Sequence, residues 1–270
     1  MTANPQASGD PPRRGVRGRR AAALIVLVLG LAGLVISAYG VVIQLLPRQF
    51  SAAQQRQIEN WQIASRWQQL PAGQIFPASV RYQLSNRVLQ DATPLDLNAL
   101  RIGIAPQSGC GADVTTSAAA AVLRRDGCRA VLRATYVDST WSYVTTVGVA
   151  VLPSDAAARQ ASLSLSQPQL TAAGNAKTDR LPAGILVVRY HGSAAAMFDY
   201  SRQISASFAD GPYLVMYAAG YADSRPRVPV VSDRYSDAEM TSLAKGVAQL
   251  VADTLAARPA SPHCPGSPGC

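Results

Sequence analysis

The chain has 270 residues, of which 48% are hydrophobic and 15% are charged, and its formal net charge is +9. Five arginines and one aspartate within residues 1–20 supply +4 of that charge, which leaves +5 for the rest of the chain. A charge of this size, spread thinly, is not the basic footprint of a nucleic-acid-binding domain. We therefore expect no nucleic-acid partner.

An apolar stretch covers residues 21–46 and contains no Asp, Glu, Lys, Arg or His. It is longer than the roughly 20 residues that cross a bilayer as a helix, and the arginines lie immediately before it. The positive-inside rule then places the N-terminus in the cytoplasm and the later residues outside. We predict a disordered basic tail over 1–20 and a single transmembrane helix over 21–46, held in the lipid bilayer of the cell membrane. A cleaved signal peptide is the alternative, although its apolar core is usually about 7–15 residues long.

A second helix is predicted directly after this stretch. Ser51 and Gln54 have the spacing of a capping box, and Pro71 and Gly73 end the helical pattern. We expect a stalk helix over 51–70 that either lies on the membrane or docks on the domain that follows.

Residues 75–258 are predicted to form one α+β domain, followed by a Pro/Gly/Cys tail over 259–270. Asp210-Gly211 is a strong hairpin signal, and short hairpins favour an antiparallel sheet. Because the helices must bury their apolar stripes on that sheet, we expect an antiparallel sheet with helices mainly on one face. The predicted strands cover 78–84, 100–105, 128–137, 141–152, 185–190, 197–208 and 213–221, and the helices cover 113–125, 156–165 and 236–257.

Two segments of the domain echo one another. Residues 134–141 read ATYVDSTW and residues 206–213 read ASFADGPY, and each segment turns a hairpin that a helix follows. The hypothesis is that the domain contains two ββα units of common origin, with chance convergence on hairpin chemistry as the alternative. Units of common origin would place their helices alike relative to their hairpins.

All four cysteines follow the apolar stretch: Cys110, Cys128, Cys264 and Cys270. On the outer side of a membrane they would meet an oxidising compartment. Two disulfides allow three pairings, and the local choice is Cys110 with Cys128 and Cys264 with Cys270. No cysteine belongs to a C-x-x-C pair, so we predict neither a metal site nor a cofactor.

Candidate catalytic residues are few. The chain has two histidines, and a hydrolase would have to use His191, with Ser193 and Asp199 as its nearest partners. No G-x-S-x-G, P-loop, G-x-G-x-x-G or H-E-x-x-H pattern is present in the sequence. We assign no catalytic residue, and the sequence leans against an enzyme without deciding the question.

The order of a short basic tail, one anchor, a stalk helix with Trp61 and Trp67, and an Ala-rich outer α+β domain resembles uncharacterised single-pass membrane proteins of actinobacteria. The resemblance is one of layout and implies no activity. The first functional hypothesis is a binding or scaffold domain that acts through its sheet surface or a hairpin-lined groove on an unknown envelope protein or polymer. The alternatives are a sensor domain for a small apolar or glycan ligand and, more remotely, a hydrolase that uses His191. A cavity lined by aromatic side chains would favour the ligand-binding alternative.

Overall fold

The computed structural model describes residues 27–34, 36–37, 51–84, 95–166, 184–196, 198, 202–223, 225 and 234–259. The chain divides into two compact units, Met1–Ala52 and Ala53–Cys270. In the first unit, residues 27–34 and 36–37 are helical. No helix within the described ranges is both long and apolar enough to cross a membrane, so the transmembrane helix over 21–46 stays a prediction.

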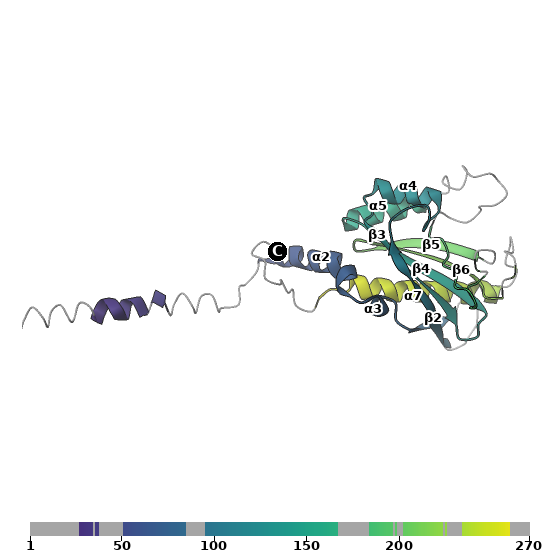
Figure 1. Cartoon of the computed structure of the whole chain (residues 1–270), viewed down its shortest axis with the longest axis horizontal. Coiled ribbons are helices and arrows are strands. Elements are labelled where there is room, and N and C mark those ends of the chain that lie inside the picture. Colours follow the sequence, from purple (N-terminus) through teal and green to yellow (C-terminus); the bar gives the residue numbers. More distant parts are fainter. Residues whose placement is uncertain are drawn as a thin grey trace, which may run out of the picture. The chain divides into compact units, whose positions relative to one another are not determined.

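The second unit is built on a six-stranded antiparallel sheet with the strand order β1-β2-β3-β4-β6-β5 (Figure 1). The antiparallel prediction is therefore confirmed. β6 has the predicted bounds, whereas β2 begins earlier and ends later than the predicted strand over 100–105. The strands are β1 (Ser79–Leu84), β2 (Leu95–Ser108), β3 (Ala130–Asp138), β4 (Tyr143–Val151), β5 (Arg202–Asp210) and β6 (Tyr213–Tyr221).

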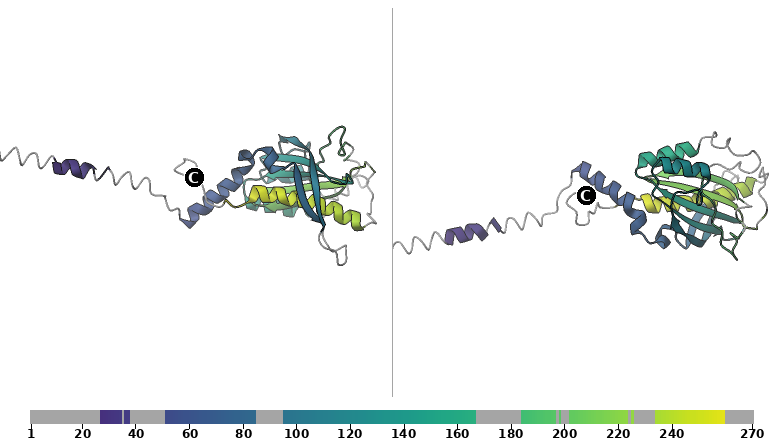
Figure 2. Two further views of the ribbon diagram at one scale, coloured as in Figure 1. Left: turned by 90° about the horizontal axis from the view of Figure 1, so that it is seen from below. Right: turned by 45° about the horizontal axis from the view of Figure 1, so that its top comes forward.

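Helices cover both faces of this sheet. Figures 1 and 2 show α4 and α5 together on the opposite side from α7. The helices of the domain are α2 (Ala52–Gln69), α3 (Ala72–Ile75), α4 (Ser117–Arg125), α5 (Asp155–Leu165) and α7 (Arg234–Ala256). Along β6, Tyr217 contributes to the core under α7, and its neighbours Met216 and Ala218 contribute to the core under α4 and α5.

The prediction of helices mainly on one face is wrong, for a physical reason that lies in two strands. Every residue of β4 and of β6 is buried, as is typical of strands that face packed layers on both sides. The polar side of β5 is also covered. Ser205 pairs with Ala218 and thus faces α5, whose Ala158 and Ala161 are small enough to lie close to the strand.

The hypothesis of two ββα units of common origin is wrong as well. The β3–β4 hairpin is followed by α5 and the β5–β6 hairpin by α7, but the two helices pack on opposite faces of the sheet. The turns also differ, because Asp210 pairs with Tyr213 whereas the last pair of the other hairpin is Val137 with Val144. The similar sequences therefore reflect hairpin chemistry alone.

Residues 184–190, here called the strap, do not form the predicted strand over 185–190. They make a single bridge, from Thr115 to Ile185, and cross the sheet face that α4 and α5 cover. Two threonines of the sheet hold the strap: Thr146 Oγ1 accepts from Val188 N at 3.1 Å, and Thr135 Oγ1 donates to the Val188 carbonyl at 3.1 Å. The apolar alternation of the segment thus serves packing on a face rather than a place in the ladder.

Glycines in two strands make room for the strap. A Cβ added to Gly148 would lie 2.5 Å from Ile185 Cδ1, and one added to Gly103 would lie 2.5 Å from the ring of Tyr190. Real carbon atoms do not approach this closely, so any larger residue at either position would displace the strap.

α2 docks on the domain, which is one of the two predicted arrangements. Ile58 is fully buried. Arg66 Nη1 donates to the carbonyls of Thr254 at 3.4 Å and Leu255 at 3.2 Å, and also to that of Ala257. The last carbonyls of a helix have no partner within it and carry its partial negative charge. This contact, here called the Arg66 clasp, therefore joins the first helix of the domain to the end of its last.

Candidate functional site: a groove beside α3

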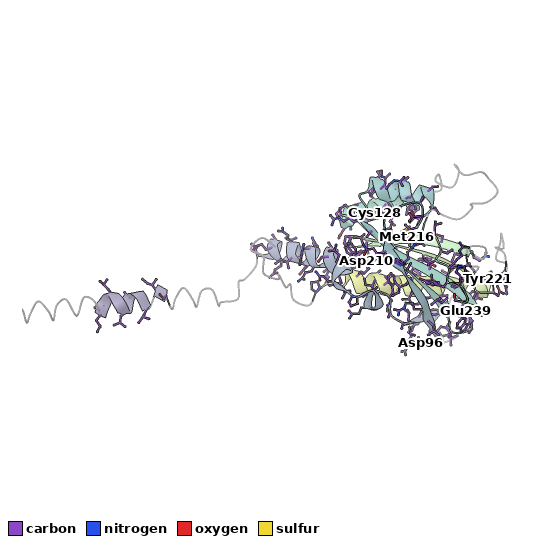
Figure 3. The ribbon with its side chains drawn as sticks, viewed as in Figure 1. Asp96, Cys128, Asp210, Met216, Tyr221 and Glu239 are labelled. Carbon is purple, nitrogen blue, oxygen red and sulfur yellow. A yellow bond between two sulfur atoms is a disulfide. The ribbon has the colours of Figure 1, made fainter. Side chains whose placement is uncertain are left out.

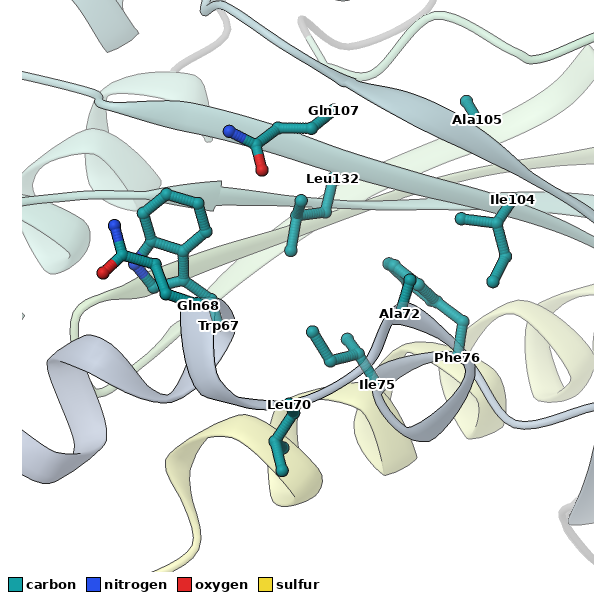
Figure 4. Close-up of a pocket in the computed structure, with 10 residues that line it drawn as sticks. All are labelled: Trp67, Gln68, Leu70, Ala72, Ile75, Phe76, Ile104, Ala105, Gln107 and Leu132. Atoms are coloured by element: carbon teal, nitrogen blue, oxygen red, sulfur yellow. The ribbon is translucent and has the colours of Figure 1, made fainter.

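A groove of about 420 Å³ lies where the α2–α3 corner meets β2 and β3 (Figure 4). Most of its walls are apolar, and its polar side chains are the exposed amides of Gln68 and Gln107. None of the described residues that line it is charged. The lining consists of Trp67, Gln68, Leu70, Ala72, Ile75, Phe76, Ile104, Ala105, Gln107 and Leu132.

The groove exists because one edge of β2 is only partly covered. β1 pairs with β2 only as far as Leu100, opposite Ser79. Beyond that point β2 contains Pro106, which has no N–H to donate, and the pairing of β2 with β3 shifts between Ala105 and Ser108. Proline in a sheet is confined to edges and bulges, and a bulge redirects the side chains around it. The α2–α3 corner lies against this irregular edge and leaves a hollow there.

Hydrogen bonds from the sheet fix the α2–α3 segment in place. The Tyr213 hydroxyl donates to the carbonyl of Ile63 in α2, and the Tyr136 hydroxyl donates to the carbonyl of Pro77 at 3.0 Å. Burial raises the pKa of Tyr213 to about 12 and also raises the pKa of Tyr136. Both hydroxyls therefore remain protonated donors at neutral pH. The groove is accordingly preformed, as small-ligand sites usually are.

The chemistry of the groove favours binding over catalysis. Its described lining offers no carboxylate, imidazole, thiol or hydroxyl that could act as an acid, a base, a nucleophile or a metal ligand. Trp67 and Phe76 supply large apolar surfaces. The amides of Gln68 and Gln107 can both donate and accept hydrogen bonds, so the groove suits an apolar ligand with a neutral polar end.

Of the predicted cysteine pairs, the first is confirmed. Cys110 and Cys128 form a disulfide with their Cα atoms 6.1 Å apart. It joins the segment after β2 to the segment before β3, and so brackets α4 as predicted. Cys264 and Cys270 lie outside the described residues.

The structure does not bring a hydrolase site together at His191. This residue is exposed in a turn where Gly192 has a φ of 75°, and it makes no hydrogen bond or ion pair within the described part of the chain. The Ser193 hydroxyl is occupied by the same turn, because it donates to the Tyr190 carbonyl at 2.6 Å and accepts from Ala195 N at 3.2 Å. Asp199 lies outside the described residues.

The groove was missed from the sequence because its walls belong to segments far apart in the chain. The predicted strand over 100–105 stopped before Gln107, and α3 was taken as the end of the preceding helix. Pro106 inside a strand was the available signal, since it indicates a bulge or an uncovered edge.

Comparison of the chain with known protein families, with curated proteins and with solved structures found no match. The groove and the predicted anchor are therefore the basis on which a function is inferred.

Proposed function

We propose that the protein is a single-pass membrane protein of the cell envelope whose outer α+β domain binds an apolar ligand in the groove beside α3. The observation that carries this proposal is the preformed, uncharged groove between α3 and β2. The apolar stretch over 21–46 and the arginines before it support the anchored, outward-facing arrangement.

Ligand binding is favoured over a scaffold that acts through the sheet surface. α7, α2 and α3 contribute to the core on one face of the sheet, and α4, α5 and the strap contribute to the core on the other. Every residue of β4 and β6 is consequently buried. The groove, in contrast, is open, and its volume falls within the roughly 300–1,000 Å³ typical of ligand pockets.

The ligand that fits best is an uncharged lipid with an alkyl or acyl chain. The described lining includes no side chain that would pair with a charged headgroup. The residues between position 46 and the start of α2 span at most about 20 Å when extended. Lipid chains are therefore the apolar groups nearest to an anchored domain of this kind.

The arrangement in the membrane gives one testable prediction. A periplasmic-type reporter enzyme fused after residue 50 is expected to be active, and the same enzyme fused after residue 15 is expected to be inactive, because the arginines keep the tail in the cytoplasm. Reporter activity in whole cells measures this directly. Equal activity of the two fusions, or release of the later fusion into the medium, would contradict a retained anchor.

A second prediction tests the groove with a matched pair of substitutions. Membranes that contain the full chain are irradiated with a long-chain alcohol that carries a photoreactive diazirine, and labelled peptides are identified by mass spectrometry. Ala72→Trp fills the groove and is expected to reduce labelling of the Trp67 and Leu132 peptides roughly tenfold, as loss of a well-packed contact region does. Ala78→Trp adds the same side chain at another exposed alanine, outside the groove, and should leave labelling unchanged.

Each outcome of this experiment has a clear meaning. Labelling spread evenly over the domain, or labelling equally reduced by both substitutions, would refute a lipid site in the groove. Cross-linking of the groove to another protein would instead favour the scaffold hypothesis.

A further inference from the structure

The tip of the β3–β4 hairpin has an unusual backbone. Trp141 has a φ of 59°, the one positive value among the non-glycine residues that the structure describes. Glycine and asparagine adopt this left-handed conformation readily, whereas a bulky residue there is strained. The side chain gains no burial in return, because it is 57% exposed. Strained residues of this kind cluster at functional sites.

A buried carboxylate imposes this conformation. Asp138 is 1% exposed, and its Oδ2 accepts from Thr140 N at 2.9 Å and from the Thr140 hydroxyl, while its Oδ1 accepts from Tyr143 N at 2.6 Å. Its carbonyl also accepts from Trp141 N at 3.1 Å. The turn is thus fixed from beneath, and the indole is held outward in one place rather than left on a mobile loop.

The surroundings of the indole are polar and planar. Ser139, Thr140 and Ser142 are all exposed, and the Ser142 carbonyl accepts from Ala222 N at 2.9 Å, which brings the end of β6 alongside the tip. Two residues beyond lies an exposed ion pair, in which Arg225 Nε is 2.7 Å from Asp223 Oδ2.

This ion pair is also held in position. The Arg225 guanidinium lies over the ring of Tyr221, 4.4 Å from the ring centroid, and Tyr221 in turn lies against Tyr143, with 5.9 Å between the ring centroids. The surface formed by residues 139–142, Asp223 and Arg225, here called the Trp141 tip, therefore combines one fixed aromatic face with several fixed hydrogen-bonding groups.

We propose that the Trp141 tip is a saccharide-binding site, in which a pyranose ring stacks on the indole and its hydroxyls bond to Asp223, Arg225 and the serine and threonine hydroxyls. A sugar ring has an apolar C–H face bounded by hydroxyls, which matches one aromatic plane surrounded by donors and acceptors. A membrane surface would instead require several apolar side chains around the tryptophan. A protein interface would be expected to have a larger apolar centre.

This site is distinct from the groove. β3 runs from Leu132 in the groove to Asp138 at the tip, a distance of about 20 Å at 3.3 Å per residue. Figure 3 likewise shows Tyr221 far from Asp210, which lies at the other end of the sheet. The two proposals can consequently fail independently.

The test uses the full chain in a polyoxyethylene detergent, which carries no sugar, and isothermal titration calorimetry with chitotetraose and with maltotetraose. Binding of at least one tetrasaccharide is expected, and Trp141→Gly should weaken it roughly tenfold or more. Because glycine relieves the strained φ, the same substitution should raise the Tm rather than lower it. Trp61→Ala removes another exposed tryptophan, on α2, and should leave the affinity unchanged.

Several results would overturn the proposal. The absence of binding by both tetrasaccharides would do so, as would unchanged affinity in Trp141→Gly. If Trp141→Gly lowers the Tm, then Trp141→Asn, which also tolerates the turn, replaces it as the deciding variant. A lipid role is tested with the Trp61→Phe/Trp67→Phe variant in vesicles of brominated phosphatidylcholine, because quenching of the remaining Trp141 would place the tip in the membrane and refute the saccharide site.

Discussion

Replacing Cys110 and Cys128 together by serine is expected to lower the free energy of unfolding by about 3 kcal/mol. The disulfide spans 18 positions, and in the chain-entropy description a closed loop of this length stabilises the fold by roughly that amount. For a domain of this size the loss corresponds to a fall in Tm of about 6–12 °C. Urea denaturation followed by circular dichroism measures the change.

The other cysteine pair provides the control for this experiment. Cys264 and Cys270 follow the end of α7, so their replacement by serine should leave the free energy of unfolding within about 0.5 kcal/mol, as for surface substitutions in general. Equal midpoints for the Cys110→Ser/Cys128→Ser variant and the unmodified chain would contradict a stabilising role for the disulfide that brackets α4.

Gly148→Val is expected to destabilise the domain by about 2 kcal/mol. Its added carbons would collide with Ile185, since even a Cβ would lie 2.5 Å from Cδ1 and 2.7 Å from Cγ1 of that residue, and overpacking of this kind typically costs about 1–3 kcal/mol. The preference of valine for strands is worth at most about 1 kcal/mol and does not offset the collision. Urea denaturation measures the loss, and faster amide exchange at Val188 should accompany it as the strap is displaced.

A double-mutant cycle shows whether the strap is the cause. Ile185→Ala removes the colliding atoms, so Gly148→Val should cost at least about 1 kcal/mol less in that background, as expected for residues in contact. Gly109→Val is the matched control, because Gly109 has open space around its Cβ position. Strictly additive effects of Gly148→Val and Ile185→Ala would disprove the described contact.

Local sequence signals predicted those elements whose pattern depends on a single segment. The bounds of β6 follow from its apolar run and from the Asp210-Gly211 turn. The start of α5 follows from its cap, where the Ser154 hydroxyl accepts from Ala157 N at 3.2 Å. In both cases the residues that determine the element lie within it or next to it.

The strap illustrates the opposite case. Residues 185–190 have the composition of a strand, and nothing within them distinguishes a ladder from a sheet face. The distinction is made by Gly103 and Gly148, which lie in other strands and leave room for Tyr190 and Ile185. A property that depends on which strands become neighbours is not accessible to a reading of one segment at a time.

The same reasoning separates the disulfide from the groove. Pairing of Cys110 with Cys128 was predictable because the two residues are close in the sequence and bracket one helix. The groove requires Trp67, Ile104 and Leu132 to converge where β1 stops pairing with β2. That end point is a feature of the assembled sheet, to which Pro106 alone gives a local clue.

The Arg66 clasp also determines when the domain can be completed during synthesis. Arg66 bonds to carbonyls that lie 188–191 positions later in the chain, and a ribosome that adds about 5–20 residues per second needs roughly 10–40 s to reach them. Throughout this interval the side of α2 that carries Ile63 and Trp67 has no finished surface to pack on. α2 is therefore the first helix of the domain to be made and the last to be secured. A chain that is cut short before residue 254 retains its first helix but cannot close the clasp.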